Sequence, residues 1–545
     1  MKQILWEKEV PKNPFSVSRV WKVAASAGCG KTFTIERCIN ELLADGVKPS
    51  SIMYVSYNTL PSLQFRSKFP HFNEEDMRWW ATHHAICSRL LKLNPSTRFK
   101  KPMERKEMAE FGILYDYDFA EDEDGEDGYE AKKLRLSVSR KQFNQEPLDD
   151  EEQAYLENLK SYELENNVKD FNSIIFDTID LSLFPREVQF VFVDEAQDNG
   201  KVQNTYWMRM LETHATLKGF MLVGDDKQAI NRYKGGNAED FLGFQAERNV
   251  SFDTSYRCPK PVLEFANAIA EPLALRSPLV EHSASKKKGS VTHPPKLAVI
   301  CDEILDDLKE HKRVFILARI NKTNDMAKSV LREFAVPYAS AIHERIRRIF
   351  RAFADIKRTG VITAQELDVL SPLTQRKRGP GDLGLTCKYF DKDKRKNYLK
   401  QQKNLDKSQL GFLQLYEEED FGGTKLELAA SLGFTEQFIA DVLGEGPDPD
   451  CFLGKKTQSP VESVKEWVRL YGPDYQAVEL LSVHRSKGLE ADTVILLGDL
   501  DQFSYEREKE ELEDARRIWY VAATRSLDKL IVTCVNPRAE FSRLL

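Results

Sequence analysis

Short apolar runs separated by helical patterns recur along two stretches of this chain. In the first stretch the runs lie at 21–24, 51–57, 188–193 and 219–223, and in the second at 314–318, 478–483 and 494–497. Apolar runs of this length are typical of buried strands, and strands that alternate with helices form parallel sheets. The pattern predicts an α/β fold with two doubly wound parallel-sheet cores. We also expect the strand at 51–57 to lie beside the strand at 21–24.

Each core is interrupted by a segment of different composition. The first segment has weak apolar periodicity and is acidic, with 17 Asp and Glu against 6 Lys and Arg over residues 116–165. The second is basic in its first half, with 17 Lys and Arg against 8 Asp and Glu over residues 343–410. Such composition predicts mostly helical insertions with solvated loops, and we expect one such loop at 121–128.

These changes of pattern predict a division of the chain into six parts. The first core comprises 1–92 and 181–253, the second core 254–340 and 471–545, and the two insertions 93–180 and 341–470. A Lys- and Pro-rich stretch at 285–296 is predicted to be a surface loop of the second core.

Composition limits the class of protein. The chain has 545 residues and a net charge of −7, which does not exclude nucleic acid, because a groove can be basic on an acidic protein. The 8 cysteines form no C-x-x-C pair, which argues against a zinc site and a disulfide framework. No apolar run reaches transmembrane length, and the N-terminus is too charged for a signal peptide. We expect a soluble, intracellular protein of the cytoplasm that does not bind membranes.

The first strand leads into a sequence with the features of a phosphate-binding loop. This loop comprises Ala25, Ser26, Ala27, Gly28, Cys29, Gly30, Lys31 and Thr32. Apolar residues at helical spacing follow it, at Phe33, Ile35, Cys38, Ile39 and Leu42. Glycines let backbone N–H groups curl around an anion, and the start of a helix adds its positive dipole end. Lys31 is placed to reach the β- and γ-phosphates of ATP, and the Thr32 hydroxyl to hold Mg²⁺.

Two later strands end in residues that suit nucleotide hydrolysis. The third apolar run is followed by DEAQD, in which Asp194 is placed to hold Mg²⁺ and Glu195 to act as a general base toward water. The fourth run is followed by GDDKQ, in which Gln228 is a candidate for sensing the γ-phosphate or orienting the water. The alternatives are a surface acidic turn for DEAQD, which the phosphate-binding loop upstream disfavours, and a polar turn for GDDKQ, which is weak evidence in isolation.

Two arginines offer positive charge for the oxygens of a transferred phosphoryl group. They are Arg257, in SYR, and Arg525, in AATRS. A single arginine after a strand is normally a surface residue, but two of them in the second α/β unit suit a site shared between two cores.

These motifs occur together and in one order along the chain. They read GCGKT, DEAQD, GDDKQAINRYKGG, SYR, SVHRSKGLEADTVILLGD and RRIWYVAATRS. The set resembles the motifs of superfamily 1 helicases of the UvrD/Rep/PcrA group. Thr82-His83-His84 is similar to the T-F-H-S motif of that family, and residues 55–58 are more loosely similar to its T-F-T-N motif. The glutamine motif that the family places before the phosphate loop has no match here.

The resemblance implies two RecA-like cores of the P-loop NTPase kind, with ATP and Mg²⁺ bound in the cleft between them. It implies that the first core supplies Lys31, Thr32, Asp194, Glu195 and Gln228. Arg257 and Arg525 would reach in from the second core. Tyr256 would stack on adenine, and Glu490 would bind ribose.

The resemblance also implies single-stranded DNA as a partner, lying across both cores. The residues that would contact it are Asn58, Thr82, His83, His84, Tyr233, Lys234 and His484. The function so implied is that of an ATP-dependent DNA helicase or translocase that moves 3′ to 5′. Two alternatives remain open: a single-strand translocase that displaces proteins without unwinding, and a nucleotide-switched nucleic-acid-binding module.

The basic insertion suggests a second DNA partner, a duplex with a single-stranded tail. Within it, Ile346, Ile349, Phe350 and Phe353 fall on one helical face. We hypothesise that basic residues hold the duplex ahead of the motor, namely Arg345, Arg348, Lys394, Arg395 and Lys396. The alternative is a solvated charged helix over a small core. No protein partner is indicated.

Overall fold

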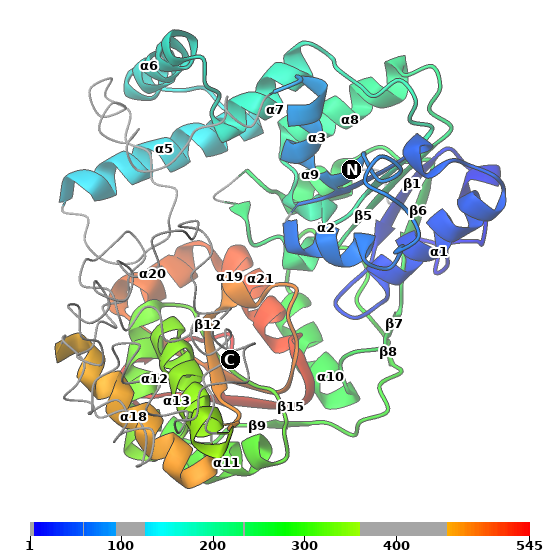
Figure 1. Cartoon of the computed structure of the whole chain (residues 1–545). Coiled ribbons are helices and arrows are strands. Elements are labelled where there is room, and N and C mark those ends of the chain that lie inside the picture. The colour runs from blue at the N-terminus through cyan, green and yellow to red at the C-terminus, as the bar shows by residue number, and fades with distance from the viewer. Residues whose placement is uncertain (1–4, 58, 94–125, 233–234, 360–454, 473) are drawn as a thin grey trace, which may run out of the picture.

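The computed structural model describes residues 5–57, 59–93, 126–232, 235–359, 455–472 and 474–545. These residues form two parallel sheets of six strands each, covered by helices, and two pairs of short strands. Figure 1 shows the sheet of the first core above and to the right of the sheet of the second core. The prediction of an α/β fold with two parallel-sheet cores is confirmed.

The first sheet is built from strands that are far apart in sequence. Its spatial order is β3 (Trp80–Thr82), β2 (Ile52–Ser56), β4 (Phe190–Val193), β5 (Gly219–Gly224), β1 (Val20–Ala24) and β6 (Arg248–Ser251). All neighbouring strands are parallel. The predicted pairing of the strand at 51–57 with the strand at 21–24 is wrong, since β4 and β5 lie between them. Parallel strands are joined by crossovers, so succession in sequence does not decide which strands become neighbours.

Helix α1 (Lys31–Ala44) follows β1 directly and packs one face on the sheet. Ile35, Cys38, Ile39 and Leu42 are buried, as the spacing predicted. Phe33, which we expected on the same face, has 67% of its surface exposed. It lies two residues before Ile35, and residues two apart point to different sides of a helix.

The second sheet has the spatial order β11 (Tyr338–Ala339), β12 (Val478–Ser482), β10 (Val314–Ala318), β13 (Ala491–Leu497), β15 (Ser526–Thr533) and β9 (Ser290–Thr292). It too is parallel throughout. The edge strand β9 lies inside 285–296, where we predicted only a loop, so that prediction is wrong in part. An edge strand pairs on one side only, here with β15, and therefore tolerates polar residues.

The helices of the first core all precede those of the second core along the chain. The first core and its acidic segment contain α1, α2 (Thr59–Arg66), α3 (His83–Leu90), α5 (Glu126–Asn144), α6 (Asp150–Asn166), α7 (Phe171–Asp180), α8 (Lys201–Thr213) and α9 (Ala238–Gly243). The second core and its basic segment contain α10 (Lys260–Ala270), α11 (Cys301–Lys309), α12 (Asn321–Glu333), α13 (Ala341–Thr359), α18 (Lys455–Tyr471), α19 (Val483–Ser486), α20 (Gln502–Glu510) and α21 (Leu512–Ala523). No described helix has both the length and the apolar composition that crossing a membrane requires.

The described part of the acidic segment is largely helical. It contains α5, α6 and α7, and α5 and α6 extend away from the first sheet in Figure 1. Val138, Tyr155, Leu159 and Tyr162 form a small core of their own between these helices. Residues 126–128, which we expected in a loop, form the first turn of α5, and 121–125 lie outside the described residues.

Two helices at the ends of the basic segment belong to the hydrophobic core of the second sheet. The predicted apolar face of α13 is confirmed, since Ile346, Ile349, Phe350 and Phe353 are buried. These side chains share one cluster with Val461, Val464 and Trp467 of α18 and with Ile316 and Val478 of the sheet. The helices α13 and α18 therefore extend the second core rather than standing apart from it.

The two cores meet along a continuous apolar cluster. It runs from Ile35 of α1 through Val262 of α10 and Tyr520 of α21 to Val494 of β13. Helix α21 also contacts the 3₁₀ turn η5 (Asp226–Gln228), which follows β5 of the first sheet. The ends of β1, β4 and β5 therefore face the second core.

Candidate active site between the cores

The site begins at the turn between β1 and α1. Gly28 and Gly30 have φ angles of 73° and 85°, in the left-handed region that favours glycine. Gly30 is the N-cap of α1, so the free N–H groups of the first helical turn face the loop. A Cβ on Gly28 would lie 2.3 Å from the Cβ of Arg257, so the loop passes against this residue only because position 28 has no side chain. The turn has the form of an anion cradle.

Strand β4 brings two carboxylates to the same edge of the sheet. Asp194 is buried, and Glu195 has a φ of 53°, a conformation that residues other than glycine rarely adopt. The Nζ atom of Lys31 lies 3.9 Å from Oε1 of Glu195 and donates a hydrogen bond to the carbonyl of Ala25 at 3.3 Å. The loop lysine and the candidate base therefore face each other.

Opposite charges around Lys31 and Glu195 keep both of these side chains ionised. Burial acts to raise the pKa of Glu195, but the ammonium groups of Lys31 and Lys487 bring it well below its ordinary value. Burial acts to lower the pKa of Lys31, yet neighbouring carboxylates, Glu195 first among them, leave it above its ordinary value. Burial and the charge of Glu195 raise the pKa of Asp194. At neutral pH the site pairs an ionised carboxylate with an ammonium group.

The donor atoms at this edge suit a magnesium nucleotide. Thr32 is exposed in the first turn of α1, and Asp194 directly follows β4. Hydroxyl and carboxylate oxygens are ligands that Mg²⁺ prefers. Oδ1 of Asp194 accepts a hydrogen bond from the Glu195 amide at 2.9 Å, and Oδ2 accepts one from the Tyr54 hydroxyl at 3.0 Å. These residues therefore fit a magnesium nucleotide. Thr32 and Asp194 would hold the metal ion, and the backbone amides of the loop would bind the phosphates.

The second core reaches this site through Arg525. Its Nη2 donates to Oε1 of Gln228 at 3.0 Å, while Nε2 of Gln228 donates to Asp225 at 2.6 Å. Arg525 is 1% exposed and also donates to the carbonyls of Val521 and Leu489. Burial lowers the pKa of Arg525 to about 10, which leaves the guanidinium charged at neutral pH. Gln228 of one core and Arg525 of the other are thus in direct contact.

Arg257, Tyr256 and Glu490 also lie at the phosphate-binding loop. Nε of Arg257 lies 2.8 Å from Oε2 of Glu490, and both side chains are partly exposed. The Tyr256 amide donates to the carbonyl of Gly28 at 2.9 Å, while its side chain is 68% exposed. The structure therefore brings together all the residues that the resemblance assigned to the nucleotide.

Two residues of this site had no role in the sequence analysis, although both lie inside recognised motifs. Nε2 of Gln197 donates to Oε2 of Glu195 at 2.6 Å, and Oε1 of Gln197 accepts from the Asp225 amide at 2.9 Å. Nζ of Lys487 lies 2.6 Å from Oδ2 of the buried Asp198, across the interface between the cores. DEAQD and SKGLE contain these two residues, but a motif does not reveal which partner a side chain reaches.

The predicted single-strand contacts that the structure describes, Thr82, His83, His84 and His484, fall on two similar turns, one in each core. Thr82 caps α3 by accepting a hydrogen bond from the Ala85 amide, and Ser482 caps α19 by accepting one from the Arg485 amide. The second residue of each helix, His84 in α3 and His484 in α19, is half-buried. Each turn therefore leaves one histidine partly accessible at the end of a strand.

His83 does not lie at the surface of this structure, and its predicted contact with DNA stays a prediction. It is 5% exposed and stacks on Trp207 with ring centroids 4.9 Å apart. Burial lowers its pKa to about 4, so it is neutral at pH 7. It occupies the first position of α3, and the matching first position of α19 holds the fully buried Val483.

Several predicted DNA contacts lie outside the part of the chain that the structure describes. They are Asn58, Tyr233, Lys234, Lys394, Arg395, Lys396 and the side chain of Arg345. Arg348 is described: it is exposed, and its Nε lies 3.6 Å from a carboxylate oxygen of Glu344. The hypothesis of a duplex-binding surface therefore stays a prediction.

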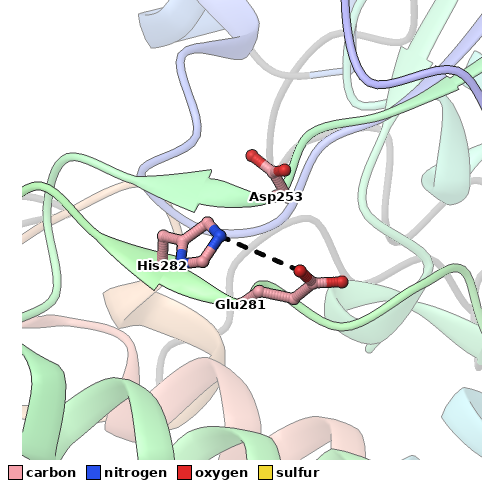
Figure 2. A group of neighbouring side chains, drawn as sticks. All are labelled: Asp253, Glu281 and His282. Atoms are coloured by element: carbon pink, nitrogen blue, oxygen red, sulfur yellow. Dashed lines mark ion pairs between the residues drawn. The ribbon is translucent and has the colours of Figure 1, made fainter.

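A group of possible metal ligands lies apart from this site. Figure 2 shows Asp253, Glu281 and His282, with an ion pair drawn between the last two. Nζ of Lys8 lies 2.8 Å from Asp253 and 3.7 Å from Glu281. The ammonium group of Lys8 therefore lies beside both carboxylates.

Two parallel-sheet cores with one phosphate-binding loop and an inter-core arginine define the class of two-core P-loop NTPases. Comparison with known proteins agrees with this class. Residues 6–249 match the UvrD/REP helicase N-terminal domain, and residues 468–537 match the UvrD-like helicase C-terminal domain. The chain belongs to the UvrD/Rep/PcrA group of superfamily 1 helicases.

Curated relatives extend the match over almost the whole chain. The ATP-dependent DNA helicase PcrA of Staphylococcus epidermidis is 20% identical over 618 residues, covering 96% of this chain and 82% of the relative. The protein of the same name from Staphylococcus aureus is 20% identical over 628 residues, with the same coverage of both chains. The family predicted from the motifs is confirmed.

Proposed function

We propose that this helicase uses ATP hydrolysis between its two cores to move 3′ to 5′ along single-stranded DNA and to separate the strands of a tailed duplex. The observation that carries the proposal is the contact between Gln228 and Arg525, at 3.0 Å, next to Lys31 and Glu195. A site assembled from two cores changes with the distance between them, so turnover and relative movement are coupled.

The residues of the first core provide the chemistry of hydrolysis. Glu195, held ionised beside Lys31, accepts the proton of the attacking water. Lys31 and the loop amides bind the phosphate oxygens. Thr32 and Asp194 hold Mg²⁺, which supplies positive charge to those oxygens when bound.

Two arginines of the second core provide positive charge to the nucleotide site of the first core. Arg525 is fixed by Gln228, whereas Arg257 is held by Glu490 at the mouth of the loop. Both guanidinium groups stabilise negative charge that develops on the transferred phosphoryl group. Tyr256, exposed beside the loop, offers its ring to the base of the nucleotide.

The path of single-stranded DNA crosses the ends of the strands in both cores. Thr82 and His84 in the first core and His484 in the second lie on equivalent capped turns, which supports one strand passing over both. When the cores close and reopen, these turns approach and separate, and the strand advances.

An ATPase assay with three activators tests the proposal. We expect turnover to rise strongly with single-stranded DNA and less with blunt duplex DNA or RNA. A slow rate that no nucleic acid stimulates would instead indicate the nucleotide-switched binding module.

Strand-separation assays test the direction and the outcome of movement. Duplexes with a 3′ tail should be unwound, and those with a 5′ tail should not. Movement on bare single strands without unwinding of either duplex would indicate the translocase that only displaces proteins. Unwinding confined to 5′ tails would contradict the proposed direction.

A further inference from the structure

A buried tyrosine holds one oxygen of the aspartate at the end of β4. Tyr54, in the middle of β2, is 1% exposed, and its hydroxyl donates to Oδ2 of Asp194 at 3.0 Å. Oδ1 of the same carboxylate accepts from the Glu195 amide at 2.9 Å, and the Asp194 amide donates to the carbonyl of Val55 at 2.8 Å. The carboxylate is therefore fixed at both oxygens, one by the backbone and one by this phenol.

The ring of Tyr54 is held independently of its hydroxyl. It stacks on Phe65 of α2 with ring centroids 4.0 Å apart and planes 12° from parallel. Phe65 in turn packs against Phe69 and Trp80, with centroids 5.6 Å and 6.0 Å away. Aromatic packing of this kind fixes a ring in one position, so the phenolic oxygen stays within reach of Asp194.

We propose that Tyr54 is a positioning residue for magnesium, acting through Asp194. The hydroxyl uses one lone pair of Oδ2 and leaves the carboxylate acceptor capacity for the metal. Since a fixed carboxylate loses no rotational freedom when the metal binds, the hydrogen bond favours binding. This inference rests on the proposed role of Asp194 as the carboxylate that holds Mg²⁺.

The substitution Tyr54→Phe isolates the hydroxyl, because it keeps the ring and its stacking on Phe65. The measurement is the binding of a fluorescent ADP analogue while MgCl₂ is titrated, with EDTA as the metal-free reference. Loss of an outer-shell partner typically weakens metal binding about 10- to 100-fold. Mg²⁺ is expected to tighten binding of the ADP analogue. In Tyr54→Phe, the Mg²⁺ concentration that gives half of this gain in affinity should rise about tenfold or more. The affinity for the analogue in EDTA should be unchanged.

A matched control removes a different buried tyrosine hydroxyl from the same core. Tyr206 donates to the carbonyl of Leu183 at 2.8 Å, away from the carboxylates, so Tyr206→Phe should leave the Mg²⁺ requirement unchanged. A general loosening of the core would instead shift both variants alike. An unchanged Mg²⁺ requirement in Tyr54→Phe, or equal shifts in the two variants, overturns the inference.

Two further variants keep the outcome decisive. Phe65→Leu retains the hydroxyl but removes the stacked ring, and it should raise the Mg²⁺ requirement in the same direction; it carries the test if Tyr54→Phe does not fold. Asp194→Asn should abolish the tightening by Mg²⁺. If Asp194→Asn keeps the full Mg²⁺ effect, the proposed metal site is wrong. If only Tyr54→Phe and Phe65→Leu lack an effect, the metal site stands and the role of Tyr54 falls.

Discussion

The two cores share a six-stranded parallel sheet but differ in the loops that lead from a strand into the next helix. In the first core, β1 leads through Gly28 and Gly30 into α1, and the turn forms an anion cradle. In the second core, β10 leads into α12 through Arg319 and Ile320, without a glycine. Arg319 forms an ion pair with the buried Glu508 at 2.9 Å, so its charge is neutralised by a residue of the same core.

The same contrast holds for the acidic residues. Asp194 and Glu195 of the first core surround Lys31, whereas Asp499, after β13 of the second core, accepts hydrogen bonds from the amides of Val535 and Asn536. A parallel sheet therefore does not make a hydrolysis site by itself. The loops at the strand ends do, and the second core contributes by directing cations toward the loops of the first.

The largest effect should follow from a change in the first core. Glu195→Gln removes the proton acceptor but keeps a side chain of the same size beside Lys31 and Gln197. We expect DNA-stimulated turnover to fall by about 10²- to 10⁴-fold, since general-base catalysis contributes that much. ATP binding, measured as displacement of the fluorescent ADP analogue, should stay within a few-fold of the unmodified protein. Turnover close to normal would remove Glu195 from the role of base.

A smaller loss should follow from removing either cation of the second core. Arg257→Ala and Arg525→Ala should each lower DNA-stimulated turnover more than tenfold, about 1.4 kcal/mol of barrier. Because Arg525 is buried and bonded to three carbonyl or amide oxygens, its variant needs a melting curve as a control. If that variant is unstable, Arg525→Lys keeps the charge but loses the fixed geometry. Normal hydrolysis by either variant would separate that arginine from the site.

The smallest effect should come from Lys487 and Asp198, which pair across the interface between the cores. Lys487→Met leaves the carboxylate of Asp198 buried without its cation. We expect the KM for ATP to rise roughly fivefold, because the arrangement in which the two cores close around the nucleotide becomes less stable. The double variant Lys487→Met with Asp198→Asn should recover part of the loss, with a coupling energy of about 1 kcal/mol. Strictly additive effects would show that the pair does not hold the cores together.

Local signals in the sequence predicted the chemistry of the site well. The glycines, Lys31 and Thr32 stand within one short turn, so the phosphate-binding loop follows from neighbouring residues and the helix after it. The same holds for the carboxylates that follow β4 and for the apolar face of α13, because strand ends and helix periodicity are properties of adjacent residues. The motif set was specific enough to predict the family.

Contacts between distant segments were decided by the tertiary structure. The sequence could not place β4 and β5 between β2 and β1, since a crossover can join strands at any separation in the sheet. It did not show that α8 brings Trp207 against the ring of His83 and buries it. It assigned nothing to Tyr54, whose partner Asp194 is 140 residues away. A residue type states which bonds a side chain can form, but only the packing of the whole chain decides which partner comes within reach.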